Sequence, residues 1–238
     1  MIASGKGGTG KSTIATFLAT ELALNGYKTF LTELDMGLRS IDVISGVSDK
    51  SIYDIGDVLS GESSISQAVI TSPHTDKLHI MPAPGKRIEY GLENLKKLTD
   101  RIYNDYDYII IDTAAGIGEA FTAALPVSKT AIIVCTADVV SVRDARTVSD
   151  EIYASGIKDI RLIINKFDKN TFRYSGFTDG DQIIDACCAQ LLGVIPYDVN
   201  IQVASMDGKT LSRESLSKKI FSAIGDRLQG KHTPMIVK

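Results

Sequence analysis

The sequence predicts an α/β fold, in which a single domain holds a doubly wound, mostly parallel sheet that is flanked by helices. Short apolar runs alternate with longer amphipathic segments along the chain. The apolar runs are nearly continuous, which is typical of strands that are buried on both faces of a parallel sheet. A glycine-rich turn at residues 4–12 follows the first apolar run and precedes an amphipathic segment, as in a strand–turn–helix unit.

Strands are expected at the apolar runs and helices at the amphipathic stretches. The expected strands are Met1–Ser4, Thr29–Leu34, Leu78–Met81, Tyr108–Ile111, Ala131–Thr136, Arg161–Ile164 and Val194–Ile195. The expected helices are Lys11–Asn25, Ile88–Tyr103, Val142–Tyr153, Gln182–Leu192 and Ser217–Leu228. Gly26 supports the end of the first helix, because glycine readily adopts the left-handed conformation that closes many helices.

Length and composition fit one soluble domain. The 238 residues are 44% apolar and 23% charged, which is ordinary for a globular protein with a sizeable core. We therefore expect a single domain over residues 1–238, in which residues 229–238 form a short tail. The net charge of −3 gives no reason to expect DNA as a partner, although residues 207–238 carry an excess of basic residues.

Cysteine usage and hydropathy predict a cytoplasmic protein. The three cysteines, of which Cys187 and Cys188 are adjacent, make no disulfide framework and fit a reducing compartment. No apolar run approaches the roughly 18 residues of a membrane-spanning helix. The N-terminus shows no basic region followed by an apolar stretch, so no signal peptide is expected.

Residues 5–12 satisfy the phosphate-loop pattern G-x-x-x-x-G-K-[S/T]. Glycines let the backbone turn tightly and direct successive N–H groups at phosphate oxygens, and the helix adds its unpaired N-terminal donors. Lys11 would reach the β- and γ-phosphates, and the Ser12 hydroxyl would bind Mg²⁺. A glycine-rich turn without a ligand is the alternative, which the Lys-Ser pair disfavours. The expected nucleotide-binding residues of this loop are Gly5, Lys6, Gly7, Gly8, Thr9, Gly10, Lys11, Ser12 and Thr13.

Two aspartates follow expected strands, at the sheet edge where ligands gather. Asp112 ends an apolar run as in a Walker B element and would bind Mg²⁺ through its water shell. Asp35 follows another strand, where a carboxylate can hold the attacking water or a metal-bound water; a loop-capping acid is the alternative. Gly116 would let the backbone pass close to the γ-phosphate. This loop could therefore distinguish bound ATP, which has that phosphate, from bound ADP, which lacks it.

A second lysine in the loop adds a family resemblance. The string from Lys6 to Ser12, Lys-Gly-Gly-Thr-Gly-Lys-Ser, resembles the deviant Walker A motif of the MinD/ParA family of ATPases. The resemblance implies a P-loop NTPase fold and implies that Lys6 crosses a dimer interface to touch the partner's bound phosphates. Relatives also have several more residues before the loop, so the true start of the protein is expected upstream of this numbering.

The resemblance extends from residue 3 to about residue 225. The segment 33–42, Glu-Leu-Asp-Met-Gly-Leu-Arg-Ser-Ile-Asp, resembles the switch region of MinD proteins. Asp35 matches the aspartate that is linked to hydrolysis, whereas Glu33 stands where the family has a further aspartate. The stretch Ser141–Arg146 resembles one that faces the dimer partner and a protein regulator. A solvated helix start with Ser141 as N-cap is an equal alternative from the residues alone.

Recognition of the base rests on the resemblance. In MinD-like proteins two loops wrap the adenine, and the matching residues here are Asn165, Pro196 and Asp198. An asparagine side chain offers a donor and an acceptor together, which suits the adenine edge. Because Asn-Lys-x-Asp at residues 165–168 also resembles the guanine-reading motif of GTPases, GTP stays open.

The resemblance implies an Mg²⁺-dependent ATPase that dimerises on ATP and acts as a spatial switch in the placement of the division site. ATP and Mg²⁺ would be its cofactors, and Lys6, Lys11 and Asp35 would carry catalysis, with Ser12, Asp35 and Asp112 on the metal side. One alternative is a ParA-type partitioning ATPase, which needs a basic surface for DNA. The other is a metal-insertion or biosynthetic enzyme on the same fold, for which the three cysteines do not offer a cluster-ligating pattern.

The C-terminal segment is the candidate for membrane binding. Ser217–Leu228 has one apolar face beside basic residues, so it could lie on an anionic membrane. We expect instead that it is the last helix of the domain and packs on the sheet. Residues 229–238 are too short and too mixed for a second amphipathic helix. Peripheral attachment at the inner face of the cell membrane therefore stays open, without a clear targeting helix.

Overall fold

The computed structural model describes residues 1–36, 39–85 and 92–236, and within these residues the strands form a single sheet. The sheet has eight strands in the order β3-β4-β2-β5-β1-β6-β7-β8. All neighbours are parallel except β3 and β4. The predicted α/β fold with a mostly parallel sheet is confirmed. The strands are β1 (Ile2–Ala3), β2 (Thr29–Glu33), β3 (Ile70–Thr71), β4 (Leu78–Met81), β5 (Tyr108–Asp112), β6 (Thr130–Thr136), β7 (Asp159–Phe167) and β8 (Gln190–Pro196).

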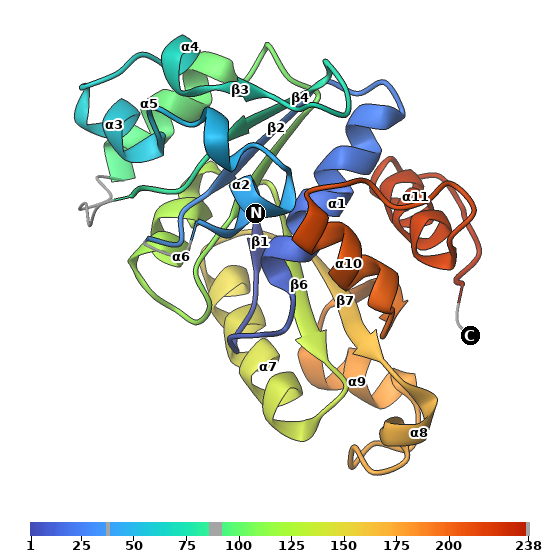
Figure 1. Cartoon of the computed structure of the whole chain (residues 1–238). Coiled ribbons are helices and arrows are strands. Elements are labelled where there is room, and N and C mark those ends of the chain that lie inside the picture. The colour runs from blue at the N-terminus through green and yellow to red at the C-terminus, as the bar shows by residue number, and fades with distance from the viewer. Residues whose placement is uncertain (37–38, 86–91, 237–238) are drawn as a thin grey trace.

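Helices cover both faces of the sheet (Figure 1). One face packs against α1 (Lys11–Leu24), α2 (Ser40–Ile44), α10 (Val199–Asp207) and α11 (Leu216–Leu228). The other face packs against α3 (Ile55–Ser60), α4 (Ile65–Ala68), α5 (Leu92–Ile102), α6 (Glu119–Ala124), α7 (Val139–Ala154) and α9 (Gly180–Cys187). The short helix α8 (Lys169–Phe172) and the 3-10 turns Ser48–Lys50 and Leu125–Val127 lie in connections.

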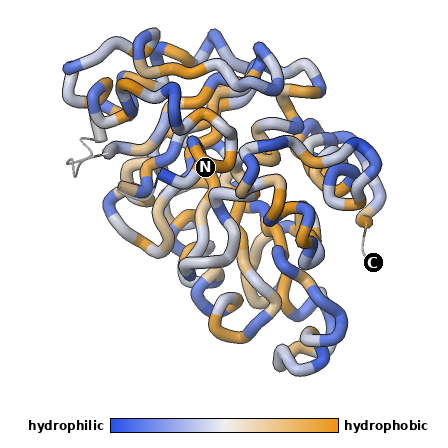
Figure 2. Tube along the Cα trace, in the orientation of Figure 1, coloured by the Kyte–Doolittle hydropathy of each residue, from blue (hydrophilic) through white to orange (hydrophobic). Residues whose placement is uncertain are grey.

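The central strands contribute side chains to two separate hydrophobic cores, one on each face of the sheet. Along β6, Ala131, Ile133 and Cys135 belong to the core under α7, while Ile132 and Val134 belong to the core under α1 and α11. Successive side chains of a strand point to opposite faces, so an apolar strand serves both cores. The hydrophobic segments in Figure 2 accordingly run through the middle of the molecule.

Register places the acidic strand ends side by side. Strands β2 and β5 pair from Thr29 opposite Tyr108 to Glu33 opposite Asp112. Strand β1 lies on the other side of β5 and leads directly into the glycine-rich loop. Because β1, β2 and β5 are neighbours and parallel, their carboxyl ends form one edge of the sheet, where the predicted phosphate and metal residues meet.

Several element boundaries differ from the sequence prediction. The helix expected over Gln182–Leu192 ends at Cys187, because Cys188 adopts a left-handed conformation with φ of 48°. Residues from Gln190 instead begin β8, where Leu192 is buried in the sheet. The sequence prediction also missed the edge strand β3 and the short helices α2, α3, α4, α6, α8 and α10. The predicted helix 88–103 appears as α5, and its residues 88–91 lie outside the described residues.

The last helix packs into the domain. Ile220, Phe221 and Ile224 of α11 are at most 3% exposed and belong to the core that α1 covers. Lys218 of this helix also forms an ion pair with the buried Glu21 of α1. The apolar stripe that could have faced a membrane is therefore used inside the fold. Among the described residues, no helix has both the length and the apolar character needed to cross a bilayer.

Replacing Phe221 tests this packing. Phe221→Ala should lower the free energy of unfolding by about 3–5 kcal/mol, because it removes a fully buried ring and leaves a cavity. Lys219→Ala on the exposed side of the same helix should change it by no more than about 0.5 kcal/mol. Urea denaturation followed by circular dichroism measures both variants. Equal stabilities for the two would show that the stripe is not part of the core.

Candidate nucleotide and metal site

The glycine-rich loop presents backbone donors at the start of α1. Gly8 and Gly10 have φ values of 78° and 91°, a left-handed conformation that glycine adopts without strain. Gly10 is the N-cap of α1 and contributes no side-chain cap, so no side chain of the cap residue occupies the first N–H groups of the helix. Such a helix start is suited to bind an anion, and α1 extends over 14 residues behind it.

Two side chains near the carboxyl end of β7 hold the loop from the side. The Asn165 amide donates to the Thr9 carbonyl oxygen at 2.7 Å, and the Lys166 ammonium donates to the Gly8 carbonyl oxygen at 2.7 Å. A Cβ atom on Gly10 would lie 2.4 Å from the Asn165 amide nitrogen and would displace that side chain, and the φ of 91° favours glycine there as well. The sequence did not predict this bracing role, and the adenine contact of Asn165 stays a prediction.

The same loop packs against helix α7. A Cβ atom on Gly5 would lie 2.4 Å from the carbonyl carbon and oxygen of Asp144, which is rigid helix backbone. Gly7 has nothing within 4 Å of the corresponding position. Gly5 is therefore needed for the close approach of loop and helix, whereas Gly7 is not needed for packing.

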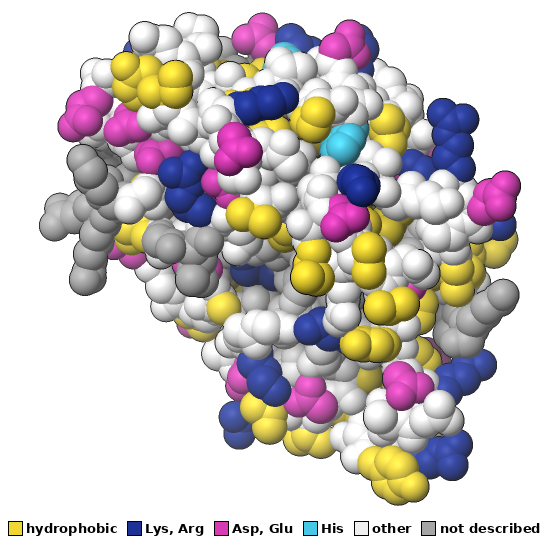
Figure 3. Space-filling model, in the orientation of Figure 1, with side chains coloured by type: hydrophobic (Ala, Val, Ile, Leu, Met, Phe, Trp, Pro, Cys, Tyr) yellow, Lys and Arg dark blue, Asp and Glu magenta, His cyan; other side chains and the backbone are white. Residues whose placement is uncertain are grey.

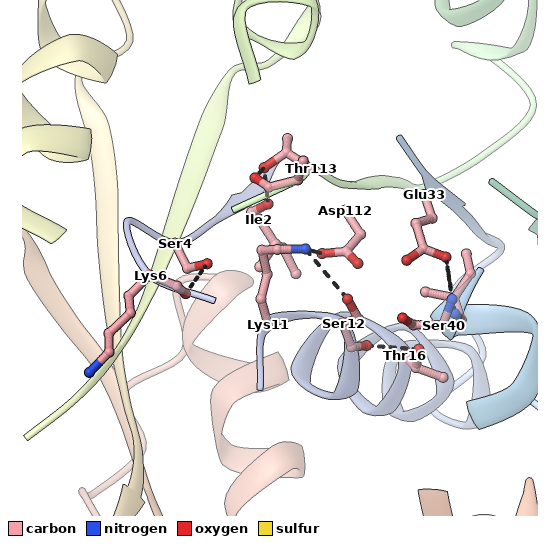
Figure 4. A network of polar contacts seen from close by, with 12 residues as sticks. Ile2, Ser4, Lys6, Lys11, Ser12, Thr16, Glu33, Ser40, Asp112 and Thr113 are labelled. Atoms are coloured by element: carbon pink, nitrogen blue, oxygen red, sulfur yellow. Dashed lines mark hydrogen bonds and ion pairs between the residues drawn. The ribbon is translucent and has the colours of Figure 1, made fainter. Parts of the chain in front are cut away.

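Lys11 and Ser12 meet the Walker B aspartate (Figure 4). The Lys11 ammonium donates to Asp112 Oδ1 at 2.7 Å and to Ser12 Oγ at 3.4 Å. Asp112 is fully buried, and Lys11 is only 6% exposed. Burial raises the pKa of Asp112, and the charge and hydrogen bond of Lys11 oppose that rise. The structure thus joins three residues that the sequence assigned separately to phosphate and metal.

Glu33 completes a pair of buried carboxylates with Asp112. Burial, together with the negative charge of Asp112, raises the pKa of Glu33 to about 7. Glu33 Oε1 and Asp112 Oδ2 are both buried and without a hydrogen-bond partner among the described residues. Buried carboxylate oxygens without partners are unfavourable, and a hard divalent cation prefers oxygen ligands. The donor set at this edge therefore fits Mg²⁺.

Asp35 and Gly116 lie at the same edge. Asp35 is close enough to raise the pKa of Asp112 through its negative charge, and it is partly exposed. Gly116 has φ of 80°, and its N–H donates to the Ser4 carbonyl oxygen at 2.8 Å. The loop after β5 is thereby tied to the start of the glycine-rich loop. The roles of Asp35 in hydrolysis and of Gly116 at the γ-phosphate stay predictions.

Lys6 points away from the other site residues (Figure 4). Its ammonium lies 3.6 Å from Asp138 Oδ1, and both side chains are about 45% exposed. Asp138, rather than the predicted Ser141, is the N-cap of α7, because its carboxylate accepts from the Ser141 N–H at 2.9 Å. Within this chain the Lys6 ammonium therefore contacts the start of α7 and is directed away from Lys11 and Asp112.

The two predicted base loops are neighbours. Pro196 pairs with Phe167 in the register of β7 and β8, so the chain segments after these strands lie side by side. Asp198 is the N-cap of α10 and accepts from the Asn200 N–H at 2.9 Å and from the Ser217 hydroxyl. Pro196 thus lies opposite a residue two positions after Asn165, and the contact of Asn165, Pro196 and Asp198 with a base stays a prediction.

A cavity of about 620 Å³ lies at the opposite end of the sheet. It opens at the amino ends of β5 and β6, where Met1, Tyr108 and Thr130 line it. None of the predicted phosphate, metal or base residues lines this cavity. Because ligands of parallel sheets gather at the carboxyl ends of the strands, the candidate site is the edge that holds Lys11 and Asp112.

Comparison with known proteins places the chain among P-loop NTPases. The ParA family model, described as "NUBPL iron-transfer P-loop NTPase", matches residues 1–229. The chain is 35% identical to a putative septum site-determining protein MinD of Guillardia theta, over 97% of this chain and 88% of the relative. The chain belongs to the MinD/ParA family of P-loop NTPases.

Two further MinD/ParA members are similar to this chain over nearly all of its length. The septum site-determining protein MinD of Bacillus subtilis is 30% identical, over 100% of this chain and 91% of its own length. A chain of the solved "MinC:MinD cell division protein complex" of Aquifex aeolicus superposes with a TM-score of 0.91 at 29% identity, covering 99% of this chain and 97% of that one. The resemblance predicted from residues 6–12 and 33–42 is confirmed.

A matched pair of loop variants tests the packing of the MinD/ParA loop on α7. Gly5→Ala should lower the free energy of unfolding of the nucleotide-free protein by about 1–3 kcal/mol, because its methyl group meets the Asp144 backbone. Gly7→Ala should leave it within about 0.5 kcal/mol, because the space around Gly7 is open. Thermal and urea denaturation without nucleotide provide the measurement. A fully stable Gly5→Ala protein would contradict the described loop–helix contact.

Proposed function

We propose that this chain is an Mg²⁺-dependent ATPase that acts in septum-site placement by switching between ATP-bound and ADP-bound states. The observation that carries the proposal is the convergence of the loop N–H groups, Lys11, Ser12 and two buried carboxylates at one edge of the sheet. The family membership and the full-length similarity to septum site-determining proteins support the cellular role.

Each residue has a defined part in phosphoryl transfer. The loop N–H groups and the α1 start would bind the β- and γ-phosphates, and the Lys11 ammonium would leave Asp112 to contact them. Ser12, Asp112 and Asp35 would hold Mg²⁺, which supplies positive charge beside the phosphate oxygens when it is bound. Asp35 would orient the attacking water. Positioning and charge neutralisation would then account for most of the rate enhancement.

A homodimer formed on ATP would complete the site. Lys6 is half exposed and turned away from the site of its own subunit, so its ammonium is available to a facing copy. Apolar side chains group over α10 on the face shown in Figure 3. Val199, Val203 and Met206 of that helix are 58%, 51% and 81% exposed. This exposed apolar surface supports association of two subunits.

A protein regulator would bind at helix α7. The Arg143 side chain on α7 is 75% exposed near Asp144, whose backbone the loop contacts. A regulator that binds α7 would therefore sense the loop conformation. We propose a protein regulator at this helix, with the protein in the cytoplasm or at the inner face of the membrane.

Iron transfer, which the matched family includes, is a second candidate function that the cysteines do not favour. Cys135 and Cys187 are fully buried, and Cys188 alone is exposed. Among the described residues, no three His, Cys, Asp or Glu side chains gather as a metal-ion cluster of that kind. Two subunits with one exposed cysteine each would supply two thiolates, whereas an iron–sulfur cluster is usually held by four. The switch is therefore the better supported function.

Lys6→Ala tests the dimer. The variant should bind ATP within about threefold of wild type, because the Lys6 ammonium pairs with Asp138 and points away from Lys11 and Ser12. It should remain monomeric with ATP, because the charge on the facing phosphates is no longer neutralised. Calorimetry and light scattering after size exclusion measure the two properties, with Lys219→Ala as an exposed-lysine control. ATP-dependent dimers of Lys6→Ala would contradict the assigned role.

Asp35→Ala tests the hydrolytic step. This variant should dimerise with ATP but hydrolyse it at least roughly 100-fold more slowly, because the attacking water loses its orienting carboxylate. Asp49→Ala, at an exposed acid of the following segment, is the matched control. Phosphate release under single-turnover conditions measures the step. Wild-type turnover by Asp35→Ala would remove Asp35 from the catalytic residues.

A further inference from the structure

Glu33 makes contacts that its position in the family pattern does not explain. It is the last residue of β2, its side chain is fully buried, and its backbone lies in register with Asp112. Where MinD proteins have an aspartate, this chain has a side chain that is one methylene longer. The extra length determines what the carboxylate can reach.

One Glu33 oxygen holds the start of α2. Oε2 accepts from the Ser40 N–H at 2.8 Å and from the Ile41 N–H at 3.1 Å (Figure 4). These are the first two N–H groups of α2, and its N-cap residue, Arg39, makes no side-chain cap. A side chain from a neighbouring strand therefore takes over the capping function that helix starts require.

The other Glu33 oxygen faces the cation site. Oε1 is buried and has no partner among the described residues, and the same holds for Oδ2 of the adjacent Asp112. Asp112 has a parallel division of roles, because its Oδ1 accepts from Lys11. Each buried carboxylate therefore has one oxygen bound to the protein and one oxygen left for a cation.

We propose that Glu33 is a positioning residue that clamps the segment carrying Asp35 by joining the start of α2 to the cation site. The clamp ties Ser40 and Ile41 to the end of β2, and Asp35 follows Glu33 by two residues. Cation binding at Oε1 would then act on the same side chain that holds α2. The metal half of this proposal rests on the proposed function, whereas the clamp does not.

Two substitutions separate the reach of Glu33 from its charge. Glu33→Asp keeps the charge but is too short to reach the Ser40 and Ile41 N–H groups. Glu33→Gln keeps the length, so its amide oxygen can accept from both N–H groups while its amide nitrogen faces Asp112. Glu62→Asp, at an exposed glutamate, controls for the shortening itself.

Amide hydrogen exchange of the nucleotide-free protein reads out the clamp. The Ser40 and Ile41 amides should exchange roughly tenfold or more faster in Glu33→Asp than in wild type, because two hydrogen bonds to a charged acceptor are lost. In Glu33→Gln and Glu62→Asp their exchange should stay within about threefold of wild type. Wild-type exchange of both amides in a folded Glu33→Asp protein would overturn the clamp.

Binding of Mn²⁺ with ATP, followed by electron paramagnetic resonance, reads out the metal half. Glu33→Gln should bind Mn²⁺·ATP about 10–100-fold more weakly than wild type, while its melting temperature without nucleotide is equal or higher. Wild-type affinity in Glu33→Gln would overturn the metal half and leave the clamp intact. Failure of the wild-type protein to bind Mn²⁺·ATP would instead contradict the proposed function, and the exchange result would still decide the clamp.

Discussion

The site depends on two carboxylates that are buried side by side at the ends of neighbouring strands. Glu33 and Asp112 lie in register on β2 and β5, and neither side chain is exposed to solvent. Like charges so close together and so far from water are unfavourable, and burial raises the pKa of both groups. Lys11 and the N–H groups of α2 stabilise one oxygen of each, and the other oxygen of each has no hydrogen-bond partner among the described residues.

This constraint connects the phosphate loop to the switch segment. Asp112 is bound to Lys11 of the phosphate loop, and Glu33 is bound to the start of α2. The two buried acids therefore contact both segments that would change in the proposed cycle. A bound nucleotide would draw Lys11 toward the phosphates and leave Asp112 to the cation. The loop itself is held from three sides, by α7 at Gly5, by Asn165 at Thr9 and by Gly116 at Ser4. Such a braced loop keeps its shape before the ligand binds, which lowers the entropy lost on binding.

The fold and the candidate residues of the loop could be predicted from the sequence because both depend on local patterns, and the roles of those residues stay predictions. Continuous apolar strands indicate a parallel sheet, and the loop pattern from Gly5 to Ser12 carries its own geometry. Asp112 could be predicted because it directly ends a strand. Boundaries failed where a single backbone conformation decides them, as at Cys188, whose left-handed φ ends α9 early and lets β8 begin at Gln190.

The rest could not be predicted because it depends on contacts between distant segments. Nothing in the local sequence shows that Lys166 reaches the Gly8 carbonyl or that Lys6 pairs with Asp138. The double role of Glu33 requires the register of β2 and β5 together with the return of the chain at Ser40. The sequence shows that residue 33 is a glutamate where the family has an aspartate. Only the structure shows that this longer side chain reaches Ser40 and Ile41.

Calorimetric titration of the wild-type protein with ATP, in Mg²⁺ and again in excess chelator, tests the central claim most directly. If the unpartnered oxygens of Glu33 and Asp112 serve a cation that accompanies the nucleotide, Mg²⁺ should tighten ATP binding by about tenfold or more, which corresponds to about 1.4 kcal/mol. Equal affinity in the two buffers, or no binding in either, would contradict it.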